Sequence, residues 1–223
     1  MSFSTLARRR GAGAFGYLLL PGIASNYANA PDSDALSITG DIDIRVKIAM
    51  TDWTPSTNSA LVYKFGAVAH QAYRFYLQTD GKLILSVSTD GTATTAGQSS
   101  AATGVADGAT KWLRVTRASA TGTIKFYTSD DGASWSQLGT DRAATAGAIY
   151  NGDTPVGLGA TDTGTLPCNG KLYRVQICNN ILDNGSGIVF DANFINTGRT
   201  FIEPASGATV TVSGASARAS IYP

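Results

Sequence analysis

The sequence holds a single histidine, a single glutamate and two cysteines, and each shortage removes a class of function. A site built from several histidines is excluded, and a Ser-His-Asp triad would have to use His70. No G-x-S-x-G motif accompanies His70, so we interpret it as a polar loop residue. Glu203 precedes a proline in an apparent turn and receives no chemical role. We therefore predict no catalytic residue, no metal site and no cofactor.

Charge is also scarce. Charged residues make up 15% of the chain and the net charge is +1, so no global electrostatic argument favours nucleic acid or an anionic membrane as a partner. No stretch reaches the roughly 18 apolar residues of a membrane span. The basic run before Ala14 to Ile23 imitates a signal peptide, but Pro21 and several glycines interrupt the apolar part, and we do not predict one.

The two cysteines flank a predicted strand, Lys171 to Ile177. An extended strand rises about 3.3 Å per residue, which holds Cys168 and Cys178 about 20 Å or more apart. A disulfide tolerates only about 7 Å between Cα atoms. We therefore predict two free thiols.

Regular alternation from Asp41 to Met50 is the clearest structural signal in the chain. Apolar Ile42, Ile44, Val46, Ile48 and Met50 alternate with Asp41, Asp43, Arg45, Lys47 and Ala49. This period of two predicts a half-buried antiparallel strand with its charges on a solvated face. Threonine, serine, glycine and valine abound elsewhere, which favours strands and turns over helices.

Further short alternating segments predict about a dozen strands. Asp80-Gly81 and Asp131-Gly132 are typical of hairpin turns, because glycine tolerates the positive φ that such turns need. The polar stretch from Thr89 to Asp107 should be loop with at most one edge strand. The pattern predicts an all-β, two-sheet antiparallel sandwich or jelly roll. The other predicted strands cover 60–65, 73–78, 83–87, 112–117, 123–128, 135–138, 156–159, 171–177, 187–194 and 210–212.

Residues 1 to 26 differ from the rest, and we predict an N-terminal arm followed by a jelly-roll domain over 27–223. An apolar arm needs a surface to pack against, and another subunit would provide one. The predicted docking residues are the basic Arg8, Arg9 and Arg10 and the apolar Phe15, Tyr17, Leu18, Leu19 and Leu20.

Five segments together resemble the concanavalin A-like, laminin-G-like jelly rolls of bacteriophage structural proteins. The resemblance covers roughly Tyr27 to Tyr222 and leaves the arm outside it. The segments are YANAPD (27–32), SITGDIDIR (37–45), WLRV (112–115), YTSDDGASW (127–135) and GKLYRV (170–175).

This resemblance implies a non-enzymatic virion protein, most simply a minor tail protein, assembled in the host cytoplasm. Its partners would be other virion proteins and a cell-surface glycan, and a homo-oligomeric ring or trimer would suit such a part. A capsid decoration protein and a secreted carbohydrate-binding lectin are the alternatives. A glycosidase of the related β-glucan type is disfavoured, because Asp41-Ile-Asp43-Ile-Arg45 lacks the third carboxylate of that motif.

Carbohydrate binding would require exposed aromatic rings beside amides and carboxylates. Trp53, and Tyr150 with Asn151 and Asp153, fit this description best, although the residue types favour a cap on the edge of the core for each ring. The Thr128-x-Asp130-x-Gly132-x-Ser134-Trp135 pattern resembles an Asp-box. We expect its aspartate to accept backbone N–H groups within the turn.

Overall fold

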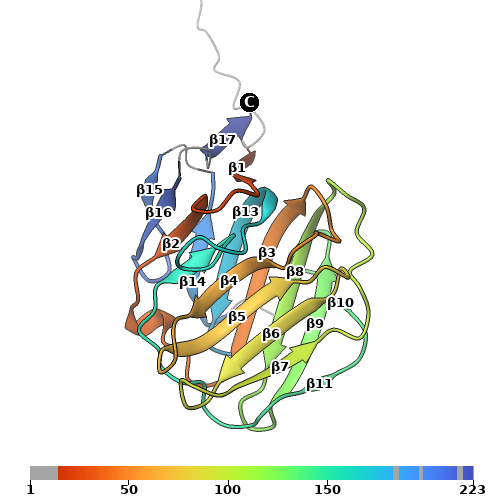
Figure 1. Cartoon of the computed structure of the whole chain (residues 1–223), viewed down its shortest axis with the longest axis vertical. Coiled ribbons are helices and arrows are strands. Elements are labelled where there is room, and N and C mark those ends of the chain that lie inside the picture. Colours follow the sequence, from red (N-terminus) through yellow and green to blue (C-terminus); the bar gives the residue numbers. More distant parts are fainter. Residues whose placement is uncertain (1–14, 183–185, 196–197, 215–217, 223) are drawn as a thin grey trace, which may run out of the picture.

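The computed structural model describes residues 15–182, 186–195, 198–214 and 218–222, and folds them into two antiparallel β-sheets (Figure 1). Helix within the described residues is confined to the 3-10 turn η1 (Asp34–Leu36). The all-β prediction is thereby confirmed.

The first sheet has nine strands in the order β10-β9-β8-β3-β13-β1-β17, with β11 beside β9 and β14 beside β13. Its strands are β1 (Phe15–Pro21), β3 (Ile42–Met50), β8 (Thr110–Arg117), β9 (Thr123–Ser129), β10 (Ser136–Gln137), β11 (Arg142–Ala143), β13 (Asn169–Cys178), β14 (Ile188–Asn193) and β17 (Arg218–Tyr222).

The second sheet has eight strands in the order β15-β16-β2-β12-β4-β5-β6-β7. Its strands are β2 (Tyr27–Ala30), β4 (Ser59–Phe65), β5 (Gln71–Leu77), β6 (Leu83–Ser88), β7 (Thr94–Gln98), β12 (Val156–Leu158), β15 (Thr200–Ile202) and β16 (Thr209–Ser213). The stretch from Thr89 to Asp107 contains one strand, the edge strand β7, as predicted.

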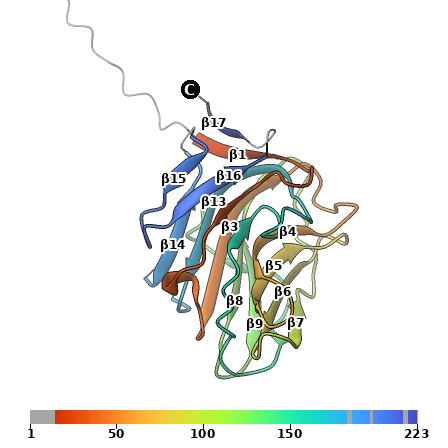
Figure 2. The same ribbon diagram turned by 60° about the vertical axis from the view of Figure 1, so that its left-hand side comes forward.

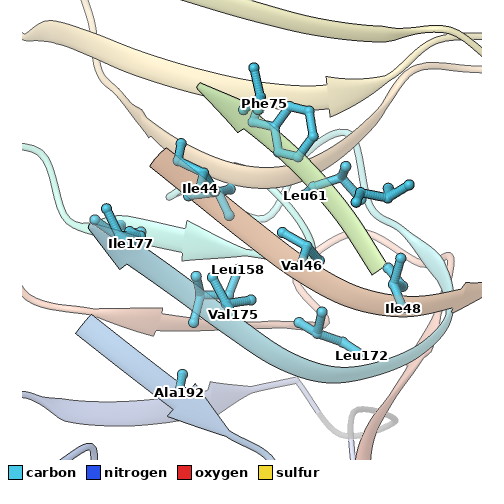
Figure 3. Packing of buried hydrophobic residues seen from close by; sticks show 14 of the residues in the cluster. Ile44, Val46, Ile48, Leu61, Phe75, Leu158, Leu172, Val175, Ile177 and Ala192 are labelled. Carbon is cyan, nitrogen blue, oxygen red and sulfur yellow. The ribbon is translucent and has the colours of Figure 1, made fainter. Parts of the chain in front are cut away.

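The core lies between the sheets. Figure 3 shows Ile44, Val46 and Ile48 of β3 beside Leu172, Val175 and Ile177 of β13, with Leu61 and Phe75 contributed by the other sheet. All of these side chains are fully buried. Burial of apolar surface stabilises a fold by about 25 cal/mol per Å², so this double layer is the main source of stability. Cys168 and Cys178 are free thiols in the interior, as predicted, and burial raises the pKa of Cys168 to about 12.

The outer face of β3 is not solvated, and that part of the prediction is wrong. Asp43 is fully buried and Arg45 is 5% exposed. Trp135 lies over the Arg45 guanidinium at 5.8 Å, and Arg45 Nη2 donates to the Leu182 carbonyl at 3.0 Å. Loops from distant parts of the chain therefore cover the charged face of this strand.

The predicted arm boundary at residue 26 is also wrong, because β1 belongs to the sandwich. It pairs with β13 on one side, where Leu18 lies opposite Leu172, and with β17 on the other. Figures 1 and 2 both place β1 and β17 at the upper end of the molecule. Leu18 and Leu20 are fully buried in the shared core, so they are unavailable for docking to another subunit. Arg8, Arg9 and Arg10 lie outside the described residues.

Two hairpin turns share one hydrogen-bond arrangement that the sequence analysis did not connect. In the β6–β7 turn, Asp90 Oδ1 accepts from the backbone N–H of Thr92 and Ala93 while Ser88 Oγ accepts from Gly91 N–H. Asp131 and Ser129 repeat this pattern after β9. The Asp-box aspartate that caps the turn is thus Asp131, whereas Asp130 pairs with Lys111 at 2.6 Å.

These turns lower the pKa of their aspartates and place a glycine at positive φ. Backbone N–H bonds from Thr92 and Ala93 lower the pKa of Asp90 to about 2. Those from Ser134 and Ala133 likewise hold the pKa of Asp131 well below its usual range. Gly91 and Gly132 have φ of +82° and +78°, a region that residues with a Cβ rarely adopt.

The Glu203 side chain stabilises the turn between β15 and β16 by accepting hydrogen bonds. It is fully buried and accepts the backbone N–H groups of Asp191, Ala205 and Ser206 at 2.7–2.9 Å. Burial alone would raise the pKa of Glu203, but the Ser206 hydroxyl and these backbone donors outweigh it and lower the pKa below its ordinary 4.5.

Truncating the β1 core residue should reveal that β1 is structural. We expect Leu20→Ala to lower the free energy of unfolding by about 2–5 kcal/mol, because it leaves a cavity in the core. The control Leu19→Ala, on a side chain that is 38% exposed, should change it by less than about 0.5 kcal/mol. Urea titration followed by tryptophan fluorescence measures both. Equal, small effects would mean that β1 is not part of the folded core.

Glu203 should make stability depend on acidic pH. Because its folded pKa lies below 4.5, its contribution is complete above that pH and is lost as the pH falls through the folded pKa. Glu203→Gln should flatten this part of the curve of unfolding free energy against pH between about 5 and 2. Urea titrations at half-unit pH steps test this, and parallel curves for both proteins would contradict it.

Candidate functional site

The outer face of the eight-stranded sheet carries an aromatic surface on β4, β5 and β6. Tyr63 of β4 lies opposite Arg74 of β5, and Arg74 lies opposite Ser86 of β6. Val62, Phe75 and Leu85 alternate with them and point into the core. We call the outward set the β4–β6 surface: Tyr63, Phe65, Gln71, Arg74, Tyr76 and Ser86.

Arg74 is the centre of the β4–β6 surface. Its guanidinium carbon lies 4.3 Å from the ring centroid of Phe65 and 5.7 Å from that of Tyr76. Phe65 in turn meets Tyr63 edge to face, with centroids 5.9 Å apart. Tyr63, Arg74 and Tyr76 are each half-buried. The rings and the cation thus fix one another in place, with Phe65 buried and part of Tyr63, Arg74 and Tyr76 open to solvent.

Three polar atoms of this surface have no hydrogen-bond partner among the described residues. They are Arg74 Nε, Gln71 Oε1 and Ser86 Oγ, and each is buried as an atom. Buried polar groups are normally paired, and leaving one unpaired costs about 1–3 kcal/mol. A donor, an acceptor and a hydroxyl therefore lie unpaired beside aromatic rings, and an external polar partner would reach them once the neighbouring side chains shift.

Amide groups continue the surface along β5 and β7. Gln98 lies in register with Ile84, which in turn lies opposite Tyr76. The Gln98 amide donates to Gln78 Oε1 and also to Asp80 Oδ2 at 3.4 Å. Hydrogen-bonding groups thus flank the aromatic centre on the side of the β5–β6 turn.

The loop with Tyr150, Asn151 and Asp153 borders the opposite end of this surface. Asp153 Oδ1 lies 2.6 Å from Nδ1 of His70, the residue just before β5. Asn151 and Asp153 are exposed, and Tyr150 is half-buried with its ring against Gly91. His70 is a half-exposed loop residue, as predicted. The predicted loop is therefore a rim of the β4–β6 surface, with Tyr150 supporting the neighbouring turn.

Trp53 is not an exposed platform for a sugar; it is buried at the core, which is the alternative that the sequence favoured. The residue is 2% exposed, and its indole Nε1 donates to the Ala109 carbonyl at 3.2 Å. Trp53 lies against the β5–β6 turn at Gly81, whereas Tyr150 packs on Gly91 at the other end of β6. The structure does not bring these two aromatic residues together.

The carboxylate of Asp43 is committed to ion pairs. Arg114 donates to it at 2.9–3.0 Å and Arg45 at 2.7 Å. The cluster is covered by Trp135, whose ring also lies 5.5 Å from the Arg114 guanidinium. A carboxylate held by two arginines away from solvent is unsuited to act as a nucleophile or general acid. This agrees with the prediction that the chain lacks the glycosidase motif.

The described residues give no sign of a metal site or a membrane span. They include no group of three or more His, Cys, Asp or Glu side chains placed to hold an ion. Within the same ranges, no helix is long and apolar enough to cross a bilayer.

The sequence analysis did not identify the residues of the β4–β6 surface. A signal was present: Tyr63-x-Phe65 and Arg74-x-Tyr76 repeat large side chains on the positions that alternate with core residues. An aromatic pair on the outward positions of one strand is unusual where that face meets water. Register between the strands was needed to bring the two pairs together.

No protein-family model and no curated protein matches the chain. Solved structures do match. The CBM40 domain of the Ruminococcus gnavus IT-sialidase, bound to α2,3-sialyllactose, aligns with a TM-score of 0.54 at 16% identity, over 74% of this chain and 93% of that one. The chain thus has a concanavalin A-like jelly-roll fold.

Two further structures share this fold. A Bacteroides ovatus protein assigned provisionally as carbohydrate-binding aligns with a TM-score of 0.67 at 11% identity, over 95% of this jelly roll and 60% of that chain. Domains LG4-5 of the mouse laminin α1 chain align with a TM-score of 0.50 at 17% identity, over 74% and 41%. None of these three is described as a virion protein, so the virion location stays a prediction.

Removing Asp43 should be strongly destabilising. We expect Asp43→Ala to lower the unfolding free energy by about 3–5 kcal/mol, because it leaves two buried arginines without their counter-ion. Asp130→Ala removes an aspartate that is 86% exposed and paired with Lys111, and should change it by about 0–1 kcal/mol. Denaturant titration compares the two variants. Similar losses would show that the buried cluster contributes nothing particular to stability.

Proposed function

We propose that this jelly roll is a non-catalytic carbohydrate-binding module that holds its ligand on the β4–β6 surface. The observation that carries the proposal is Arg74, fixed between the rings of Phe65 and Tyr76 with its Nε unpaired.

The chemistry of this surface suits a sugar ring. A pyranose offers an apolar C–H face that packs on aromatic side chains and a periphery of hydroxyls that need hydrogen bonds. Tyr63 and Tyr76 provide half-exposed rings. The unpaired atoms of Arg74, Gln71 and Ser86, each covered by its neighbours, would provide a donor and acceptors once a bound sugar displaces that cover. Stacking and hydrogen bonding are thus available within one small area.

The same surface supports binding without hydrolysis. Glycosidases require two carboxylates flanking the scissile bond, about 5 to 10 Å apart. None of the six residues of the β4–β6 surface carries a carboxylate, and Asp43 lies on the other sheet in a buried ion cluster. The fold likeness to carbohydrate-binding modules adds support to this reading.

Where the module is displayed is a separate prediction. A minor tail protein, a capsid decoration protein and a secreted lectin would all use a glycan-binding jelly roll. The docking role predicted for residues 1 to 26 is now restricted to the part before β1, since β1 is built into the sandwich.

The proposal predicts glycan binding that depends on Arg74 and Tyr76. Labelled protein should be retained on a printed array of neutral and acidic glycans. Arg74→Ala and Tyr76→Ala should each lower affinity for the retained glycans tenfold or more, which corresponds to about 1.4 kcal/mol. Each variant removes a ring or cation from the stacked centre.

Tyr127→Ala is the matched control. Tyr127 is a half-buried tyrosine on β9 of the other sheet, with the Arg114 guanidinium 5.1 Å from its ring. It has the same kind of cation–π contact as Tyr76 but lies on the opposite face, so its removal should leave binding unchanged. An array that retains nothing, or variants that bind like wild type, would overturn the proposal.

A further inference from the structure

A cavity of about 220 Å³ opens on the outer face of the nine-stranded sheet, where β1, β3 and β13 lie side by side. Its walls include Leu19, Thr51, Asn169, Lys171 and Tyr173. Ligand pockets for drug-sized molecules run from about 300 to 1,000 Å³, so this one fits a smaller ligand. It lies on the opposite sheet from the β4–β6 surface.

Two tyrosines and two lysines are interleaved along one side of this cavity: Lys171 and Tyr173 line it, and Tyr17 and Lys47 pack against Tyr173. The rings of Tyr17 and Tyr173 meet edge to face with centroids 5.7 Å apart. Lys171 Nζ lies 4.9 Å from the Tyr17 ring, and Lys47 Nζ lies 5.5 Å from the Tyr173 ring. Each ammonium group is therefore held against an aromatic face rather than extended freely into solvent.

These two lysines lack acidic partners among the described residues, whereas the other four lysines have them. The chain has six lysines, all among the described residues. Lys64, Lys82, Lys111 and Lys125 each pair with an aspartate at 2.6–3.2 Å. Neither Lys47 nor Lys171 lies within ion-pair distance of a described carboxylate. Among the lysines, the charge left without a counter-ion is thus confined to these two neighbours, one lining the cavity and one beside it.

We infer that this cavity is a second ligand site, which binds a single sugar residue that carries an acidic group. The ammonium group of Lys171, which lines the cavity, and that of Lys47, which lies against the lining residue Tyr173, would attract the carboxylate, sulfate or phosphate. The tyrosine rings and Leu19 offer apolar contact, and Asn169 and Thr51 offer hydrogen bonds for hydroxyls. The inference does not depend on the β4–β6 surface.

Isothermal titration with four probes tests it: galacturonic acid, glucose 6-sulfate, glucose 6-phosphate and neutral galactose. We expect the acidic probes to bind, more weakly at 0.5 M than at 0.05 M salt because screening grows with ionic strength. Galactose should bind at least tenfold more weakly than any of them. Equal binding of galactose would overturn the inference.

Charge-neutral variants assign the site. Lys47→Gln combined with Lys171→Gln should lower affinity for the acidic probes tenfold or more. Lys111→Gln combined with Lys125→Gln is the matched control, since these lysines already pair with Asp130 and Asp141 and should matter little. Unchanged binding in the Lys47/Lys171 variant would overturn the inference.

Two further measurements separate the alternatives. Backbone NMR shifts of residues 169–173 in the wild-type protein should move on adding galacturonic acid, which locates the site without any variant. Inorganic phosphate that competes as strongly as glucose 6-phosphate would overturn the saccharide part and leave an adventitious anion site. Arg74→Ala should leave these titrations unchanged, so failure of either site can be recognised separately.

Discussion

The pairing of β13 with β3 is the interaction on which the rest of the molecule depends. These two central strands carry the inner layer of Ile44, Val46, Val175 and Ile177. The other edge of β13 is shared, with β1 along its first half and β14 along its second. The register between β13 and β3 shifts at Tyr173, the residue between the two halves. Such an irregularity redirects a side chain, and here it accompanies the contact of Tyr173 with Tyr17 and Lys47.

The outer face of each sheet carries an arginine stacked on aromatic rings, but the two arginines differ in burial and in charge pairing. On the nine-stranded sheet, Arg114 stacks on Tyr127 and Trp135 but is also paired with Asp43 and buried. On the eight-stranded sheet, Arg74 stacks on Phe65 and Tyr76 with no carboxylate partner among the described residues and remains half-exposed. The Arg114 cluster is structural because its charge is paired with Asp43 and the side chains are buried. The Arg74 cluster has neither a carboxylate partner among the described residues nor full burial, which makes it a candidate for binding.

The residue pattern along short segments predicted strands and turns correctly. The alternation from Asp41 to Met50 predicted the strand β3, which runs from Ile42 to Met50, and Asp80-Gly81 and Asp131-Gly132 predicted turns that are present. The same reasoning failed where the environment came from distant residues. Asp43 and Arg45 alternate as if solvated, yet Trp135 and the Leu182 carbonyl cover them. The apolar run at Leu18 to Leu20 was assigned to another subunit because its partners, β13 and β17, lie more than 140 residues later.

The sequence by itself determined the all-β class, most strands, the free cysteines and the lack of a glycosidase motif, because each follows from residue type and spacing along a few neighbours. Only the tertiary structure decided which faces are covered. Tyr63 and Arg74 become neighbours through strand register. Lys47 and Lys171 can be recognised as the lysines without an aspartate partner only because the fold pairs the other four lysines with aspartates. Both candidate sites are therefore products of pairing between strands, since burial and charge compensation are set by residues that the chain brings together only on folding.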